Sequence, residues 1–332
     1  MDSILVLTVL IVIFGFGFDF INGFHDTANA IATAVSTKAL KPRHAIIMAA
    51  LMNFLGAISF TGVAETITES IVNPFTLANG QIVILSSLIS AIIWNLITWY
   101  FGIPSSSSHA IIGSIAGAAI ASSGFHVIEY RGFISIIEAL LLSPILAFTI
   151  GFTVYSIFKV AFQNFKLAKT NRHFRLIQIF TAALQSFSHG TNDAQKSMGI
   201  ITMALIANHY ITENHIPFWV QVGCAAAMGL GTSMGGWRII KTVGGNIMKI
   251  RPINGVAADL SSAFTIFGAT FIHLPVSTTH VISSSILGVG SAQRIKGVKW
   301  DTAKRMVITW VITLPISAVL SGAIYHIVSL FW

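Results

Sequence analysis

Two short polar motifs with the same pattern lie in the two halves of the chain, each inside a long apolar segment. They read Asn22-Gly23-Phe24-His25-Asp26-Thr27-Ala28-Asn29-Ala30 and His189-Gly190-Thr191-Asn192-Asp193-Ala194-Gln195-Lys196-Ser197. A carboxylate in an apolar segment is costly unless it faces a polar cavity or a partner, so Asp26 and Asp193 are candidates for a functional site. One such Asp next to a glycine could instead cap a helix where a membrane span ends. Two copies at matched places favour the functional interpretation.

A second pair of motifs follows the first pair at a similar distance in each half. These motifs read Pro104-Ser105-Ser106-Ser107-Ser108-His109 and Pro275-Val276-Ser277-Thr278-Thr279-His280. Two motifs in the same order at nearly one offset indicate an internal duplication. Duplication of half a chain is typical of secondary transporters, whose binding sites lie between the repeats.

The hydroxyl residues of the second pair of motifs follow a proline near an expected helix start. Free backbone N–H groups and hydroxyls at a helix start can bind an oxyanion. Capping of the helix would use one or two of these hydroxyls, but both halves carry more than capping needs. The oxyanion-binding candidates are Ser105, Ser106, Ser107, Ser108, Ser277, Thr278 and Thr279.

Carboxylate and amide side chains of the first pair of motifs suit a small cation or a proton. These candidates are Asp26, Asp193, Asn22, Asn29 and Asn192. Lys196 could pair with Asp193 or reach a bound anion, because a lysine in an apolar span needs such a partner. Histidine titrates near physiological pH, which suggests a proton role for one or more of His25, His109, His189 and His280. Asp259 lies in a later apolar segment and could join the network, and no residue is assigned to a resident metal ion.

The composition excludes a water-soluble protein. The chain has 332 residues, of which 54% are hydrophobic and 9% charged, and its mean hydropathy is +0.80. Soluble domains carry about 25% charged residues, so this surface must face lipid. The net charge of +8 comes from basic residues in short loops between apolar segments. That pattern indicates control of membrane topology rather than binding to nucleic acid.

The apolar segments predict an all-α polytopic membrane protein built from two repeats of about five spans each. The repeats are residues 1–158 and 176–332, joined by a basic linker at 159–175. Segments 4–35 and 176–208 are longer than the roughly 20 residues of a span and are interrupted by the Asp motifs, so we expect broken or bent helices there. We expect further spans at 44–64, 82–101, 133–157, 217–238, 254–272 and 306–330. Segments 104–124 and 275–290 are expected to be re-entrant hairpins or short crossing helices.

The basic loops orient the chain in the membrane. Basic residues cluster at 38–43, 159–175 and 294–305, and the positive-inside rule places such loops in the cytoplasm. Counting crossings gives each half an odd number of spans if 104–124 and 275–290 cross fully, so the second half is inserted upside down relative to the first. If both segments are re-entrant hairpins, the count changes and further half-crossings are needed elsewhere. The sequence therefore predicts inverted repeats in a multi-pass protein of the cell membrane, with both termini outside.

The four motifs resemble those of the inorganic phosphate transporter (PiT) family, and the resemblance covers essentially the whole chain. The family signature is a duplicated Gly-x-Asn-Asp-x-x-Asn-Ala-like motif. Here His25 replaces the usual Asn, and Gln195-Lys196 replaces Ala-Asn, as in the branch of bacterial low-affinity phosphate permeases.

The resemblance implies a secondary active transporter, with no cofactor, that imports inorganic phosphate with a co-transported cation and forms a homodimer. By similarity, Asp26, Asn29, Asn192 and Asp193 would lie at the cation and anion sites, and the Ser/Thr runs would hold phosphate. Similarity to the bacterial branch favours H⁺, since imidazole at His25 is a poor sodium ligand and a good proton acceptor. Na⁺ stays possible, as does transport of phosphate with a divalent metal.

Three alternatives stay open. The first is a sulfate or other oxyanion permease of the same family. Fully ionised sulfate needs only hydrogen-bond donors in its site, whereas phosphate keeps a proton that an acceptor such as Asp can recognise, so Asp in both motifs favours phosphate or a cation. A passive channel would carry flux that ignores the gradient of a second ion. An intramembrane Ser/His/Asp hydrolase would need one asymmetric nucleophile–base pair, but this chain duplicates its polar elements and has no GxSxG motif around its serine runs. We therefore expect a transporter and not an enzyme.

Overall fold

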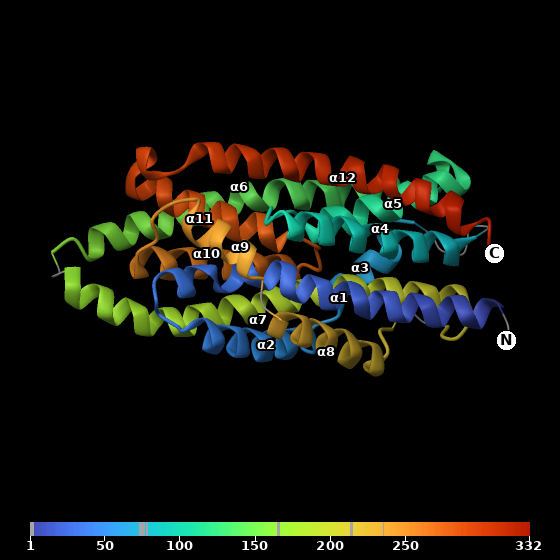
Figure 1. Ribbon diagram of the computed structural model, residues 1–332, viewed down its shortest axis with the longest axis horizontal. Helices are drawn as coiled ribbons and strands as arrows, with labels where there is room; N and C mark the ends of the chain where they lie inside the picture. The colour runs from blue at the N-terminus through green and yellow to red at the C-terminus, as the bar shows by residue number, and fades with distance from the viewer. Residues whose placement is uncertain (1–2, 73–76, 78, 165–166, 213–214, 235) are drawn as a thin grey trace.

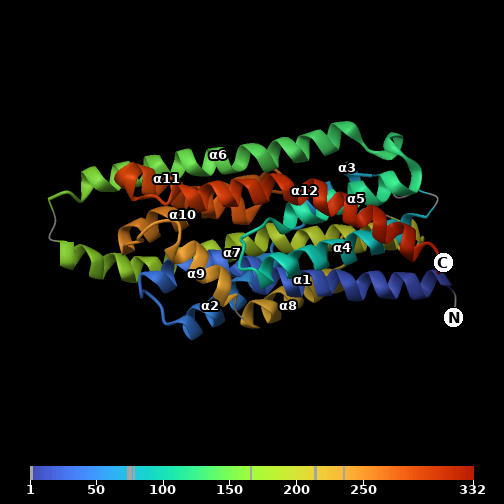
Figure 2. The same cartoon turned by 45° about the horizontal axis from the view of Figure 1, so that its top comes forward.

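The computed structural model describes residues 3–72, 77, 79–164, 167–212, 215–234 and 236–332. The described residues form an elongated bundle of helices with no β-strand (Figure 1). Four of these helices are long and apolar enough to cross a membrane, and a bent helix pair could make a fifth span. Both views place the two chain termini at the same end of the long axis (Figure 2). The all-helical prediction is confirmed.

The helices of the first half recur in the second half in the same order and with similar lengths. The first half contains α1 (Ser3–Ser36), α2 (Pro42–Ala57), α3 (Gly62–Ser70), α4 (Gly80–Tyr100), α5 (Ser107–Ser123), η2 (Phe125–Val127) and α6 (Tyr130–Ala161). The second half contains α7 (Leu167–Ala207), α8 (Phe218–Met234), α9 (Trp237–Gly245), α10 (Pro252–Phe271), α11 (Thr278–Arg294), η3 (Ile295–Gly297) and α12 (Trp300–Val328). Most of the expected linker 159–175 is thus helical, and its residues 165 and 166 lie outside the described part.

The expected breaks at the two Asp motifs do not occur. Helix α1 continues through Asp26, and α7 continues through Asp193. The sequence-based prediction was wrong here because the polar side chains find partners on neighbouring helices, so the backbone need not unwind to satisfy them. The break lies instead between α2 and α3, which are bent by 65° relative to each other.

Helices α4–α5 and α10–α11 form two hairpins that enter the bundle from opposite ends (Figures 1 and 2). The connections at 101–106 and 272–277 form their tips, which meet in the middle of the molecule. Ser108 Oγ donates to the Val276 carbonyl across 2.9 Å, and the rings of His109 and His280 lie 4.5 Å apart. The two short Ser/Thr-rich segments are therefore the returning helices of hairpins.

Glycines let helices of the two halves approach closely. A Cβ added at Gly23 of α1 would lie 2.3 Å from the Met228 carbonyl oxygen of α8. The matching glycine, Gly190 of α7, would place a Cβ 2.3 Å from the Asn53 carbonyl oxygen of α2. The motif glycines thus pack each Asp-bearing helix against a helix of the other half.

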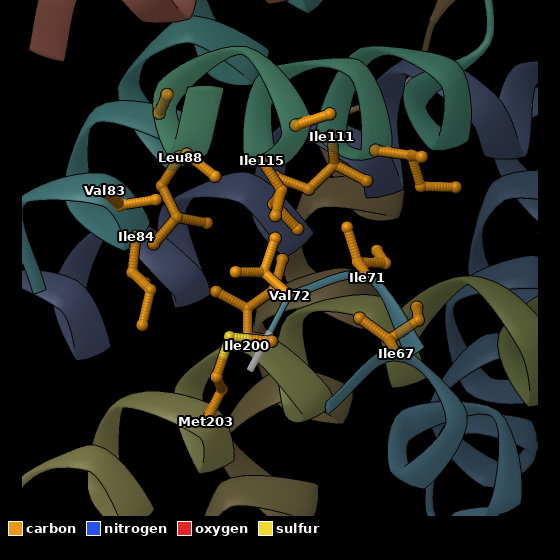
Figure 3. Packing of buried hydrophobic residues seen from close by; sticks show 14 of the residues in the cluster. Ile67, Ile71, Val72, Val83, Ile84, Leu88, Ile111, Ile115, Ile200 and Met203 are labelled. Carbon is orange, nitrogen blue, oxygen red and sulfur yellow. The ribbon is translucent and has the colours of Figure 1, made fainter. Parts of the chain in front are cut away.

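Buried apolar side chains hold the first hairpin in place (Figure 3). Leu88 of α4 and Ile111 and Ile115 of α5 pack with Ile71 and with Ile200 of α7. By contrast, the outer faces of α6 and α12 expose large apolar residues. Examples are Leu141, Leu142, Ile145, Val311 and Val319. Such faces suit lipid, as expected for a membrane protein.

Candidate functional site

The two motif Asp residues lie together at the centre of the bundle, although they are far apart in the sequence. Asp26 of α1, and His189 and Asp193 of α7, each place one ligand atom within 4.8 Å of the others. All three side chains are buried. The site is therefore built from both halves of the chain, as the duplication predicts.

Asp26 accepts hydrogen bonds from both hairpin tips. Ser107 Oγ at the start of α5 donates to Asp26 Oδ2 across 2.5 Å, and Thr279 Oγ1 at the start of α11 donates to Asp26 Oδ1 across 2.9 Å. His25 Nδ1 lies 2.7 Å from Asp26 Oδ1, and His25 Nε2 lies 3.1 Å from Thr98 Oγ1 of α4. One carboxylate thus joins α1 to both hairpins.

Asp193 is paired with a buried lysine. Lys196 Nζ forms an ion pair with Asp193 Oδ1, and it also donates to Ser108 Oγ across 2.6 Å and to the Val276 carbonyl across 3.1 Å. Thr278 Oγ1 donates to Asp193 Oδ2 across 2.7 Å. His189 Nε2 lies 3.0 Å from the same carboxylate oxygen. Lys196 therefore pairs with Asp193, as the sequence allowed, and also contacts a hydroxyl at a hairpin tip.

The hydroxyl runs divide into helix caps and residues that face the carboxylates. Ser106 and Ser277 cap α5 and α11, because their Oγ atoms accept from the backbone N–H groups of His109 at 3.1 Å and His280 at 3.3 Å. Ser105 Oγ donates to Thr98 Oγ1 across 2.7 Å. The remaining hydroxyls contact Asp26, Asp193 or Lys196 and come from Ser107, Ser108, Thr278 and Thr279. Capping and site contacts thus occur side by side.

The motif asparagines differ in what they bind. Asn29 Nδ2 donates to Thr279 Oγ1 across 2.9 Å. Asn192 fastens the second hairpin, because its Nδ2 donates to the Leu274 carbonyl and its Oδ1 accepts from the Val276 N–H, each across 3.2 Å. Both amide atoms of Asn22 are buried without a hydrogen-bond partner in the described part of the chain.

His109 and His280 lie behind the hairpin tips rather than beside the carboxylates. Their rings pack on each other, and His280 stacks on Trp310 at 4.0 Å. Both rings line an apolar cavity of about 570 Å³ between α6 and α12. Among the described contacts, neither imidazole hydrogen-bonds to Asp26 or Asp193. The structure thus brings His25, but not these two histidines, to the candidate site.

Asn53 lies outside the set predicted from the sequence, whereas His189 is one of the motif histidines considered there for a proton role. His189 lies 3.0 Å from Asp193, and its Nδ1 lies 3.0 Å from Asn53 Oδ1 of α2. Asn53 Nδ2 donates to Thr27 Oγ1 across 2.7 Å. A lone amide inside the apolar segment 44–64 was the signal for Asn53, and the position of His189 in the second motif was the signal for the histidine.

Asp259 occupies a separate polar cluster between α1, α7 and α10. It accepts from Thr33 Oγ1 across 2.6 Å and from Thr181 Oγ1 across 3.1 Å. Thr33 lies seven residues after Asp26, which is two helical turns or about 10 Å along α1. Asp259 therefore does not join the Asp26–Asp193 centre.

The arrangement can bind charges of both signs. Asp26, Asp193 and His189 offer ligand atoms close enough together for a shared cation or proton. The starts of α5 and α11 point hydroxyls and backbone N–H groups at the same place, and helix N-termini favour anions. Lys196 adds a fixed positive charge. A small oxyanion and a cation could therefore occupy this centre together.

Comparisons with known proteins agree on a family. Residues 22–321 match the model of the phosphate transporter family. The chain is 71% identical to a probable low-affinity inorganic phosphate transporter of Bacillus subtilis, over 100% of both chains. It is 43% identical to a protein of the same description from Rhizobium meliloti, over 98% of both chains. A solved structure described as the sodium-dependent phosphate transporter aligns with a TM-score of 0.88 and 27% identity, covering 98% of this chain and 100% of that one.

Proposed function

This chain belongs to the phosphate transporter family, and we propose that it imports inorganic phosphate by symport with a cation, H⁺ being favoured over Na⁺. The family and the similar proteins are phosphate transporters and not enzymes, so the hydrolase alternative is excluded.

The observation that carries the proposal is the contact of both hairpin tips with the two motif carboxylates. Ser107 and Thr279 donate to Asp26, and Thr278 donates to Asp193. These hydroxyls are the donors that a tetrahedral oxyanion would take, together with Lys196. When phosphate binds, the hydroxyls at the hairpin tips would therefore donate to the phosphate oxygens in place of the Asp26 and Asp193 carboxylates.

Charge makes this exchange dependent on a cation. The centre holds two carboxylates and one ammonium group, so it is net negative when both Asp residues are ionised and the histidines are neutral. Two like charges 4 Å apart repel by about 4 kcal/mol at an effective dielectric constant of about 20. Phosphate is itself an anion, so its binding there is favourable only when protons or metal cations neutralise the carboxylates. Cation coupling follows from this requirement.

The environment of Asp26 favours the proton over sodium. Its neighbour His25 Nδ1, at 2.7 Å, is a good proton acceptor and a poor sodium ligand. The solved relative is described as sodium-dependent, so Na⁺ is the alternative cation, and a divalent metal travelling with phosphate is a further one.

The hairpins suggest how the site could open to either side. They enter from opposite ends and meet at the carboxylates, which fits alternating access by two inverted repeats, residues 1–158 and 176–332. In this proposal the connection between α6 and α7 is cytoplasmic and both termini are outside. We also propose a homodimer, as the family resemblance implies.

The test is radiolabelled phosphate uptake into proteoliposomes under an imposed proton or sodium gradient, with sulfate as competitor. We expect proton-driven uptake that excess sulfate does not inhibit, and a loss of at least tenfold in Asp26→Asn and Asp193→Asn. Asp301→Asn, on the exposed first turn of α12, is the matched control and should transport normally. Normal uptake by both motif variants would refute the role of the carboxylates. Uptake driven by the sodium gradient and not by the proton gradient would make Na⁺ the coupling cation in place of H⁺.

A further inference from the structure

A second buried carboxylate, Asp19, lies on α1 between the N-terminus and Asp26. It is fully buried, and its Oδ1 accepts from Ser197 Oγ of α7 across 2.7 Å. Its Oδ2 has no hydrogen-bond partner in the part of the chain that the structure describes. Asp19 is seven residues before Asp26, which places it on the same face of α1 about 10 Å nearer the terminal end.

Among the described residues, no positively charged group lies within ion-pairing distance of Asp19. The described ion pairs within 4.0 Å involve Asp26 and Asp193, and none involves Asp19. Lys196 is already bound to Asp193, Ser108 and the Val276 carbonyl. The remaining titratable or charged neighbours of Asp19 are the buried Cys224 thiol of α8 and, from α7, Asp193. An ionised carboxylate left this way would be strongly unfavourable, so Asp19 must hold a proton or a mobile cation.

The available ligands favour a proton. Asn22, three residues further along the same face of α1, also has both amide atoms buried without a partner among the described residues. Residues three apart on a helix are neighbours, so a proton on Asp19 Oδ2 could be donated to Asn22 Oδ1 and would give both orphaned oxygens a partner. Hard metal cations such as Ca²⁺ and Mg²⁺ take about six oxygen ligands. Here α1 and α7 are continuous helices whose carbonyls are already used.

We propose that Asp19, with Asn22 and Ser197, is a second proton-binding site, separate from the Asp26–Asp193 centre, that takes up the coupling proton from the terminal side. The proposal rests on the proposed proton–phosphate symport. It differs from a purely structural role in one respect. A structural Asp19 would stay protonated throughout the cycle, whereas a coupling site must gain and lose its proton in each cycle.

The variant Asp19→Asn separates these roles, because Asn resembles a carboxyl group that never releases its proton. In proteoliposomes we expect Asp19→Asn to continue exchanging internal for external phosphate, since exchange needs no net proton movement. Its stimulation by an inward proton gradient should fall at least tenfold. Asp301→Asn is the matched control and should keep the full stimulation. Stimulation of Asp19→Asn equal to that of the wild type would overturn the proposal.

Infrared spectroscopy of the purified protein in lipid tests the protonation itself, independently of transport. We expect a protonated carboxyl band in the wild type that is missing in Asp19→Asn and present in Asp301→Asn. Identical bands in wild type and Asp19→Asn would overturn the proposal. If the wild type neither exchanges nor accumulates phosphate, the proposed function is refuted. The infrared band still shows in that case whether the Asp19 carboxyl group is protonated. Should Asp19→Asn not fold, Asp19→Glu must shift the band, and an unshifted band would refute the assignment.

Discussion

The two motif carboxylates have equivalent positions but different partners. Both carboxylates face an imidazole, His25 at Asp26 and His189 at Asp193, and in the described part of the chain Asp193 alone also forms an ion pair with a lysine, Lys196. We infer that Asp26, which has no lysine partner among the described residues, is the carboxylate whose charge changes during transport.

This difference predicts a non-additive effect at Lys196. Removing one partner of a buried ion pair costs about 3–5 kcal/mol, because the other charge stays buried and uncompensated. Lys196→Gln should therefore lower the thermal stability of the purified protein, and Asp193→Asn combined with Lys196→Gln should recover most of the loss. Phosphate uptake should stay low in both variants. Thermal unfolding in detergent measures the effect, and a double variant no more stable than Lys196→Gln would contradict the pairing.

A second prediction separates two adjacent serines at the tip of the first hairpin. Ser106 caps α5, whereas Ser107 donates to Asp26. Ser106→Ala should cost about 1 kcal/mol of stability, as a lost helix cap does, with a small change in the half-saturation concentration of phosphate. Ser107→Ala should raise that concentration several-fold with a small effect on stability. The comparison needs uptake kinetics and thermal unfolding of both variants. Equal half-saturation concentrations would argue against the oxyanion site.

The sequence indicates the candidate site residues more readily than the hydrogen bonds that these residues make. Duplication indicated Asp26 and Asp193 because each copy supports the other. It could not separate caps from site residues in the serine runs, since a one-residue shift along a helix start decides where a hydroxyl points. Ser277 caps the N-terminus of α11, whereas the adjacent Thr278 donates a hydrogen bond to Asp193. That distinction depends on the packing of two hairpins against α1 and α7, which no local pattern encodes.

At the scale of elements, the continuous α1 and α7 explain why a local interpretation of the motifs failed. Polar residues in an apolar segment suggested unwound backbone, because backbone polar groups at membrane depth need partners. Here the helix keeps its own hydrogen bonds, and many of the polar side chains find partners on other helices. Asn53, for example, donates to Thr27 from α2. The starts of α5 and α11 could be predicted, since proline followed by hydroxyl residues is a strong signal for a helix start, but the sequence left open whether these segments return as hairpins or cross the membrane.

The close approach of α1 and α8 gives a prediction at this scale. Gly23→Ala would place a methyl group 2.3 Å from the Met228 carbonyl oxygen, so the helices must separate. Overpacking of this kind costs about 1–3 kcal/mol. Gly17→Ala on the same helix is the control, because its Cβ would meet only Ile92 Cδ1, at 3.8 Å. We expect Gly23→Ala to unfold at a lower temperature and to transport poorly, and Gly17→Ala to match the wild type in both. Equal stability of the two variants would contradict the helix packing.

At the scale of the whole molecule, charge and shape favour one orientation. The basic clusters lie in the α1–α2 connection, at the adjoining ends of α6 and α7, and around η3, at the end of the bundle away from both termini (Figure 2). The positive-inside rule assigns that end to the cytoplasm. The sequence predicts basic loops opposite the termini because loop charge is counted over the whole chain and tolerates errors in single helix boundaries, and the cytoplasmic assignment of that end stays a prediction.

The orientation can be tested because the chain has one cysteine, Cys224, which is fully buried. In a Cys224→Ser background, Lys38→Cys and Lys296→Cys probe the basic end, and Glu129→Cys probes the terminal end. All three positions are exposed. A membrane-impermeant maleimide added to intact cells should label Glu129→Cys and leave the two lysine positions unlabelled until the membrane is permeabilised. The reverse labelling pattern would show that the protein has the opposite orientation in the membrane. Asp19 would then lie on the cytoplasmic side of the Asp26–Asp193 centre, and the coupling proton would reach Asp19 after leaving that centre rather than before entering it.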